Sequence, residues 1–177
     1  MPSKIVFFDI ETSSLEADAG IIVGAGLSTE TGKTEYLEAK KTSEEKTLLD
    51  KLLKRMETFD TIVTWSGRGF DIPYLTTRLL KHSIDPTPIL AKQHLDLNEV
   101  VRSRLRLTFT YLDHVCDFFA IRREKGPMSL EVPQLFVKSL EGDDIALKMI
   151  RDHCLDDLRV TRELFFKLKP LIQSQLD

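Results

Sequence analysis

Four carboxylates in three separated segments are the residues best suited to chemistry in this 177-residue chain. They are Asp9 and Glu11 in FFDIET, Asp71 in GRGFDIPYL and Asp157 in HCLDDLRV. The run before Asp9 is β-branched and aromatic and predicts a strand, on which side chains two apart share a face. Asp9 and Glu11 therefore converge, and their repulsion calls for a cation. Oxygen donors favour Mg²⁺ or Mn²⁺ over zinc.

His153 lies four residues before Asp157, in a stretch whose apolar spacing predicts a long helix. Residues four apart share one helix face, so His153 would stand beside the carboxylate. Because an imidazole accepts a proton near neutral pH, His153 is a candidate general base for an attacking water. The alternative is a histidine at the rim of the core.

The carboxylates also have structural alternatives. Asp71 comes at the expected start of a helix, where an aspartate often caps the backbone, although a carboxylate there can still reach a metal. Asp157 has Asp152 and Asp156 nearby on the same predicted helix, and most helical acids are solvated. The first two carboxylates follow a run so apolar that a strand ending in solvent is the weaker interpretation.

The order of predicted elements indicates how these side chains are positioned. Strands are expected over residues 4–12, 20–29, 33–40, 60–67 and 93–98. Helices are expected from Thr42, over 71–83, from Glu99, over 110–121, and over 143–169 with Pro170 as the stop, while Pro86 and Pro88 mark a loop. The pattern predicts an α/β fold: a mixed sheet, made of a three-strand antiparallel meander plus parallel strands, with helices on both faces.

Length and composition predict one domain over residues 1–177. The chain is 42% hydrophobic and long enough to bury one substantial core. It has no apolar run of about 20 residues and opens without the apolar region of a signal peptide, so we expect a cytoplasmic protein with no membrane partner. Cys116 and Cys154 lie among apolar residues and are expected as reduced core thiols.

The formal net charge of −3 argues against a broad basic surface, so contact with nucleic acid must be local. Two short basic stretches could supply it. They are RSRLR, with Arg102, Arg104 and Arg106, and RREK, with Arg122, Arg123 and Lys125. Each is either a phosphate contact or a solvated helix face or loop.

The three acidic segments also resemble a known family. DIET, GRGFDIPYL and HCLDD, in this order over nearly the whole chain, are similar to the three motifs of the DEDD (DnaQ-like) superfamily of 3′–5′ exonucleases. The similarity is closest to the exonuclease domains of family-B DNA polymerases and their stand-alone relatives. It implies a ribonuclease-H-like fold with Asp9, Glu11, Asp71 and Asp157 as metal ligands. Two cations about 3.5–4 Å apart suit in-line displacement at phosphorus.

The chain departs from the family pattern at two positions. Members with a catalytic histidine usually place it five residues before the last aspartate, and members with tyrosine place it four before. Here His153 occupies the tyrosine position, which leaves its role open. Ser66 stands where relatives often have asparagine before glycine.

Several neighbours of the motifs are candidate substrate contacts. Thr12 could hydrogen-bond the terminal sugar, and Leu15 could wedge against the last base. Phe70 and Tyr74 flank the second motif, where an exposed aromatic could stack on a base, with core packing the equal alternative. The neighbouring pair His94 and Asp96 is expected to make structural hydrogen bonds and not to bind metal.

We therefore expect a metal-dependent 3′–5′ exonuclease that uses two Mg²⁺ or Mn²⁺ ions on single-stranded 3′ ends, with DNA favoured over RNA. An exoribonuclease or an RNase-H-fold endonuclease is the first alternative. A noncatalytic nucleic-acid-binding module is the second, and loss of a ligand would favour it. A polymerase, a helicase or another repair protein is the kind of partner that could supply targeting.

Overall fold

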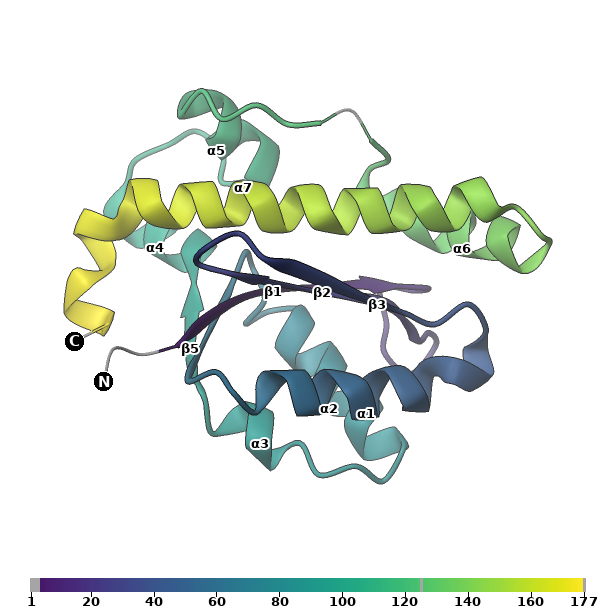
Figure 1. Ribbon diagram of the computed structural model, residues 1–177. Helices are drawn as coiled ribbons and strands as arrows, with labels where there is room; N and C mark the ends of the chain where they lie inside the picture. The colour runs from purple at the N-terminus through teal and green to yellow at the C-terminus, as the bar shows by residue number, and fades with distance from the viewer. Residues whose placement is uncertain (1–3, 125, 177) are drawn as a thin grey trace.

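A five-stranded mixed sheet forms the centre of the molecule in the computed structural model, which describes residues 4–124 and 126–176 (Figure 1). Lys125 of the RREK stretch lies outside the described residues. The strand order is β3-β2-β1-β4-β5, with β1 antiparallel to β2, β2 antiparallel to β3, and β4 parallel to both β1 and β5. The strands are β1 (Ile5–Thr12), β2 (Ile22–Thr29), β3 (Thr34–Glu38), β4 (Thr61–Thr64) and β5 (Gln93–Asp96). The predicted meander with added parallel strands is confirmed.

Helices cover both faces of the sheet, as predicted (Figure 1). One face packs against α1 (Glu45–Met56), α2 (Asp71–Lys81) and α3 (Thr87–Leu90). The other packs against α4 (Leu97–Arg104), α5 (Leu112–Phe118), α6 (Val132–Leu140) and α7 (Asp144–Leu176). Two 3₁₀ turns, η1 (Thr42–Glu44) and η2 (Ser129–Glu131), precede α1 and α6.

Alternation along β1 decides which face its carboxylates occupy. Val6, Phe8 and Ile10 are buried in the cluster formed with α1 and α2. Phe7 points the other way, into the cluster that contains α7, and its ring meets the Phe165 ring edge-on at 5.3 Å. Side chains two apart on a strand share a face, so Asp9 and Glu11 lie on the same face as Phe7 and point toward α7.

A glycine in β2 lets α7 lie directly on the sheet beside these positions. Gly26 pairs with Asp9 across the antiparallel ladder. A Cβ at Gly26 would lie 2.6 Å from Leu158 Cδ1 and 2.7 Å from Cys154 Sγ, which is closer than packed atoms approach. The bare backbone therefore permits the close helix–sheet contact that brings the face of α7 to the end of β1.

The C-terminal helix corrects one prediction from the sequence. Pro170 does not end it, because α7 continues to Leu176 with the proline inside. Leu168 and Ile172 on either side are buried in the core, so continuing the helix buries apolar surface that offsets the lost backbone hydrogen bond. Figure 1 shows the last part of α7 turning away from its earlier course, as expected where proline interrupts the ladder.

Two short helices were not predicted. The α3 helix forms within the expected loop, with Pro88 in its first turn, where a missing N–H is tolerated. The α6 helix buries Val132, Leu135 and Phe136 against the start of α7 and against β2. This helix has only nine residues, so its apolar pattern is too short to distinguish it from a loop by sequence alone.

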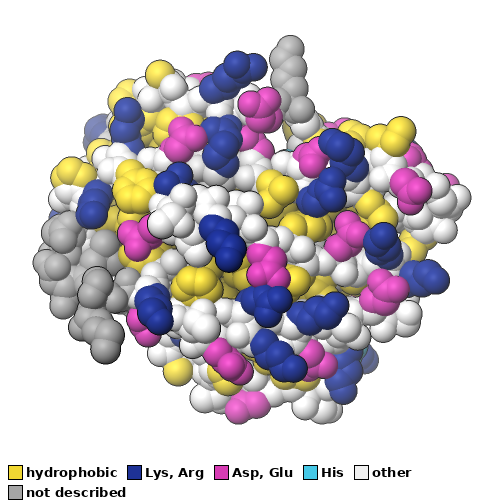
Figure 2. Space-filling model, viewed as in Figure 1, with side chains coloured by type: hydrophobic (Ala, Val, Ile, Leu, Met, Phe, Trp, Pro, Cys, Tyr) yellow, Lys and Arg dark blue, Asp and Glu magenta, His cyan; other side chains and the backbone are white. Residues whose placement is uncertain are grey.

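The surface in Figure 2 carries basic and acidic side chains mixed together, in keeping with the small net charge. Cys116 and Cys154 are free and buried, as predicted. Among the described residues, no helix combines the length and apolarity needed to cross a bilayer.

Candidate metal centre

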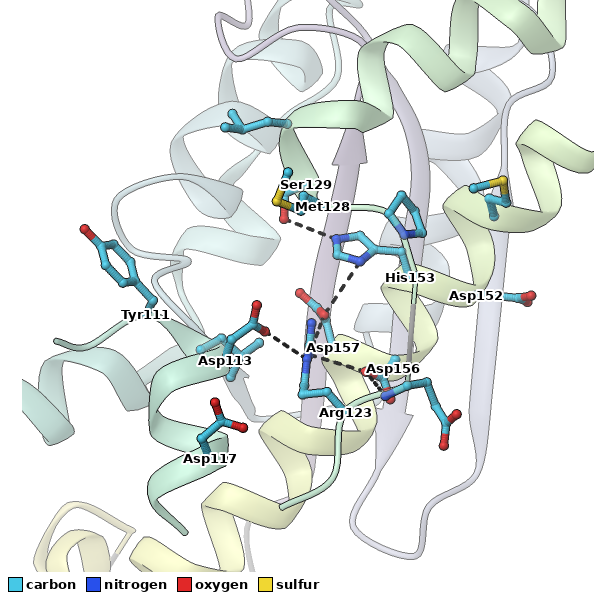
Figure 3. Close-up of a pocket in the computed structure, with 16 residues that line it drawn as sticks. Tyr111, Asp113, Asp117, Arg123, Met128, Ser129, Asp152, His153, Asp156 and Asp157 are labelled. Carbon is cyan, nitrogen blue, oxygen red and sulfur yellow. Dashed lines mark hydrogen bonds and ion pairs between the residues drawn. The ribbon is translucent and has the colours of Figure 1, made fainter. Parts of the chain in front are cut away.

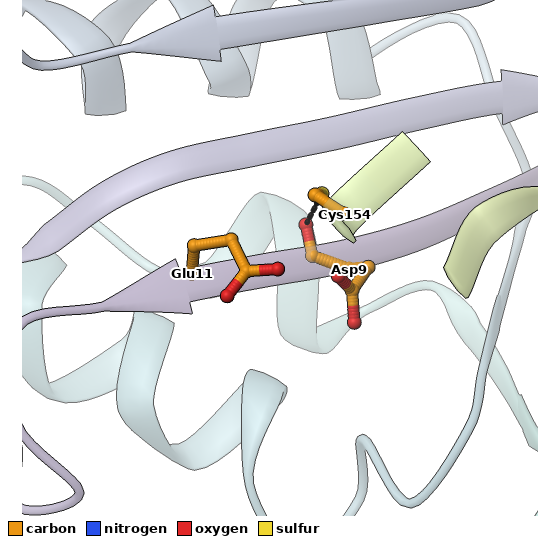
Figure 4. A group of neighbouring side chains, drawn as sticks. All are labelled: Asp9, Glu11 and Cys154. Atoms are coloured by element: carbon orange, nitrogen blue, oxygen red, sulfur yellow. Dashed lines mark hydrogen bonds between the residues drawn. The ribbon is translucent and has the colours of Figure 1, made fainter. Parts of the chain in front are cut away.

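Asp9 and Glu11 form the first part of the site at the end of β1. Glu11 is only 4% exposed, and ligand atoms of Asp9, Glu11 and Cys154 all lie within 4.8 Å of one another (Figure 4). The Cys154 thiol is a poor ligand here, because burial raises its pKa well above the ordinary value. Its sulfur lies 3.9 Å from the backbone carbonyl oxygen of Asp9, to which the thiol donates. The two carboxylates are therefore the metal donors of this trio.

Asp71 joins them where the parallel pairing of β1 stops. The ladder between β1 and β4 runs from Ile5↔Thr61 to Phe7↔Val63, and the N-terminus of α2 takes the place beyond it. The Asp71 Oδ1 accepts a hydrogen bond from the Ile10 backbone N–H at 3.1 Å. The carboxylate is thus fixed to the strand that carries Asp9 and Glu11, and it is 4% exposed.

Asp96 holds the loop that leads to Asp71. Its carboxylate accepts hydrogen bonds from the backbone N–H groups of Ser66 at 2.9 Å, Arg68 at 3.0 Å and Asn98 at 3.0 Å. Asp96 is therefore structural, as predicted. Ser66 has φ of 60°, a left-handed conformation that asparagine adopts more readily than serine, and the Asn98 side-chain amide donates to its hydroxyl at 2.6 Å.

The α7 helix supplies Asp157 and His153 from the facing side (Figure 3). His153 Nδ1 lies 4.0 Å from Asp157 Oδ1, and His153 Nε2 lies 3.9 Å from Glu11 Oε1. The Ser129 hydroxyl is 3.1 Å from the same Nε2. With 7% exposure, the ring is held between two carboxylates and a serine. The sequence predicted the imidazole beside Asp157, and the structure places Glu11 on its other side.

One cavity of 360 Å³ brings these groups together. Its walls include all four carboxylates and the imidazole, which are Asp9, Glu11, Asp71, Asp157 and His153. Thr12, Leu15 and Phe70 also line it, and Leu15 is 58% exposed at its rim. Tyr74 does not line the cavity: it is 3% exposed in the core, with its ring 5.5 Å from the Phe70 ring. Tyr74 lies four residues after Phe70 and is buried in the core, where its ring packs against the Phe70 ring.

The negative charges of the four carboxylates are not balanced by positive side chains of the described residues. Burial, followed by the charges of Asp71 and Asp157, raises the pKa of Asp9 well above its ordinary value. Burial and the other three carboxylates do the same to the pKa of Glu11. Burial raises the pKa of Asp71 to about 7 although the Ile10 N–H opposes the shift. Ionising all four groups therefore requires added positive charge.

Arg123 is a functional candidate whose position the sequence did not reveal. Its Nη1 lies 2.7 Å from Asp157 Oδ1 and 3.5 Å from Asp156 Oδ2, while its Nε lies 3.0 Å from Asp113 Oδ1 (Figure 3). Burial raises the pKa of Asp157, and the neighbouring His153 and Arg123 oppose that shift. The sequence indicated a cation here only through the RREK stretch, and its spacing gave no sign that Arg123 pairs with Asp157, 34 residues later.

The donor set fits hard divalent cations. Four carboxylates carry charge −4 and Arg123 carries +1, so the site keeps a deficit of positive charge that one or two divalent ions would reduce. Carboxylate oxygens on rigid elements are the ligands that Mg²⁺ and Mn²⁺ take.

The family model of the RNase_H superfamily matches residues 6–169. The chain belongs to the RNase_H superfamily. The match includes every carboxylate of the site, from Asp9 to Asp157.

Two relatives extend this assignment. A DNA polymerase of Methanocaldococcus jannaschii is 30% identical over 103 residues, which cover 47% of this chain and 6% of the polymerase. The structure of the family B DNA polymerase from Pyrobaculum calidifontis superposes with a TM-score of 0.82 at 21% identity, over 96% of this chain and 25% of that one. This RNase_H chain thus spans a small part of either polymerase. The resemblance to a family B DNA polymerase is confirmed.

Divalent ions should stabilise this RNase_H domain more at high pH than at low pH. A carboxyl group whose pKa is raised in the folded state stabilises the fold at pH values below its unfolded-state pKa of about 4. This contribution is lost as the pH rises through the folded-state pKa, which is about 7 for Asp71. At about 100 times its Kd, an ion adds about 2.7 kcal/mol, or roughly 5–10 °C in Tm. Thermal unfolding with chelator or Mn²⁺ at pH 5 and pH 8 measures the gain.

Asp71→Asn should shrink the gain at pH 8, whereas exposed Asp50→Asn should leave it unchanged. An equal gain in wild type and Asp71→Asn would contradict the account.

Removing Arg123 should tighten metal binding. Arg123→Gln takes away the cation that competes for Asp157, so the affinity for Mn²⁺ should rise about tenfold, or ~1.4 kcal/mol. Isothermal titration calorimetry measures the change, with the exposed neighbour Arg122→Gln as the matched control. A weaker affinity in Arg123→Gln would mean that the arginine holds Asp157 in its ligand position instead.

Proposed function

We propose that the chain is a metal-dependent 3′–5′ exonuclease that hydrolyses phosphodiester bonds at single-stranded 3′ ends, with DNA favoured over RNA. The observation that carries the proposal is the convergence of Asp9, Glu11, Asp71 and Asp157 from three elements on one cavity. Fold alone hosts many functions, so the intact set of carboxylates is the stronger argument.

The four carboxylates would hold two Mg²⁺ or Mn²⁺ ions. When bound, such ions activate water and neutralise charge on the leaving oxygen. The protein contributes rigidity: Asp9 and Glu11 lie on a central strand, and Asp71 is tied to that strand by the Ile10 N–H. A set of ligands fixed in this way needs little rearrangement before the reaction.

His153 would take the proton of the attacking water. Its two ring nitrogens face Glu11 and Asp157 at 3.9 and 4.0 Å, so the ring stands at the wall where water would attack. The Ser129 hydroxyl at 3.1 Å fixes the orientation of the ring. His153, four residues before Asp157 as the tyrosine is in some relatives, thus lines the cavity.

The cavity suits a strand end. Its 360 Å³ is near the lower limit of small-molecule sites, which accommodates one terminal nucleotide better than a duplex. Leu15 at the rim and Phe70 in the wall would bracket the terminal base, and Thr12 is positioned for the sugar. The Thr12 hydroxyl already donates to the Ser14 carbonyl oxygen at 2.8 Å, so it would accept a hydrogen bond from the ligand.

Asp9→Asn should abolish turnover because it removes a carboxylate that would hold the ions. Loss of several kcal/mol of electrostatic stabilisation corresponds to a rate lower by about 10³ or more. Single-stranded DNA and RNA, each labelled at the 5′ end, are incubated with Mg²⁺, Mn²⁺ or chelator, and the products are resolved by length. Wild type with metal should give a ladder that shortens from the 3′ end.

The exposed residue Asp18 offers the matched control, and Asp18→Asn should cleave like wild type. Fragments from internal cuts would favour the endonuclease, and faster RNA cleavage would favour the exoribonuclease. Binding without cleavage at any metal concentration would favour the noncatalytic module.

His153→Ala should lower the cleavage rate by about 10²–10⁴ while the Mn²⁺ affinity changes little, because a proton acceptor and not a ligand is lost. His153→Tyr should restore part of the rate, since relatives place tyrosine at this spacing. Single-turnover rates and calorimetric metal affinities are measured on the same preparations. A near-wild-type rate in His153→Ala would make the residue structural.

A further inference from the structure

The end of α4 and the segment that follows it present arginines and aromatic rings to solvent. Leu105 and Leu107 pack against the core, while Arg104, the last residue of α4, and Arg106, between the two leucines, are exposed. Arg102 in the last turn of α4 is also exposed. Three exposed cations within five residues are conspicuous in a chain whose net charge is −3.

These arginines lack the internal partners that other arginines have. Arg68, Arg78 and Arg159 each pair with a carboxylate. In the described part of the chain, no ion pair includes an arginine of the RSRLR stretch. Their charge is therefore free to attract a polyanion.

Two aromatic residues continue the row to the cavity. Phe109 and Tyr111 are 53% and 72% exposed, and their rings stack at 5.9 Å with 19° between their planes. Tyr111 and its neighbours Thr110 and Leu112 line the 360 Å³ cavity. Exposed stacked rings beside a cation row offer the two contacts that single-stranded nucleic acid uses, base stacking and phosphate pairing.

The part of the cleft next to this cavity is acidic. A neighbouring cavity of 750 Å³ shares Tyr111, Ser129 and His153 with the first. Its walls add five carboxylates, those of Asp113, Asp117, Glu124, Asp152 and Asp156; Figure 3 labels the four aspartates. A phosphate backbone is repelled there, which leaves the arginine row as the favourable route away from the site.

We propose that residues Arg102–Tyr111 form a track for single-stranded nucleic acid upstream of the 3′ end in the cavity. This inference rests on the proposed function for its direction. Arg102, Arg104 and Arg106 contact backbone phosphates, and the Phe109–Tyr111 pair stacks with a base. The track lengthens the binding site beyond the terminal nucleotide without requiring a basic surface elsewhere.

The test compares Arg102, Arg104 and Arg106, all changed to glutamine, with a control in which exposed Lys46, Lys51 and Lys54 of α1 are changed to glutamine. Both triples carry the same charge change. Binding of fluorescent strands of about 4 and about 16 nucleotides is followed against salt concentration in an Asp9→Asn background, which keeps the strands intact. The arginine triple should weaken binding of the long strand at least tenfold and flatten the plot of log K against log salt by about 2 units.

In the arginine triple variant, the affinity for the short strand should stay within about twofold of the value without these changes, because the cavity binds the terminal nucleotide. Tyr111→Ala should weaken long-strand binding about tenfold with an unchanged salt slope, since stacking carries no charge. Equal losses in both triples, or equal losses for short and long strands, would overturn the track. Failure of wild type to cleave any strand, together with a length-dependent loss in the arginine triple, would reject the exonuclease and retain the track.

Discussion

Mutual repulsion among four carboxylates, two of them buried and two half-buried, is the constraint on which the rest of the structure depends. Asp9, Glu11, Asp71 and Asp157 share one cavity, and burial raises the pKa of each of them. A fold gains nothing in stability from such a cluster unless a cation offsets it. Among the described residues, Arg123 is the one arginine or lysine that forms an ion pair with any of these four, and it reaches Asp157. The site is therefore arranged for external positive charge, and its stability and its chemistry depend on the same ions.

Three features of the fold keep the cluster together against that repulsion. Gly26 lets α7 approach β1 closely enough for Asp157 to reach the strand. The end of the β1–β4 pairing leaves room for the N-terminus of α2, so Asp71 bonds the Ile10 N–H. Asp96 fixes the loop before Asp71 by accepting hydrogen bonds from the backbone N–H groups of Ser66 and Arg68, and it ties that loop to α4 through the N–H of Asn98. None of these features is a ligand, yet each sets where a ligand lies.

Much of the fold and of the site could be predicted from sequence because it follows local periodicity. Strand alternation placed Asp9 and Glu11 on one face, and helical spacing placed His153 beside Asp157. Contacts between distant segments could not be predicted this way: the ion pair of Arg123 with Asp157 depends on the path of an irregular loop. For Tyr74 the sequence left base stacking and core packing open, because an aromatic after a motif suits either, and the structure places it in the core. Pro170 was misjudged because burial of Ile172 outweighs the cost of a proline in a helix.

The central claim is that the carboxylates, and not the thiol among them, bind the ions. The most direct measurement is a crystal structure of the protein soaked in Mn²⁺, with the ions located by anomalous scattering. The account predicts ions about 2.0–2.6 Å from oxygens of Asp9, Glu11, Asp71 and Asp157. An ion bound through the Cys154 sulfur, or the absence of any ion from this cavity at saturating Mn²⁺, would contradict it.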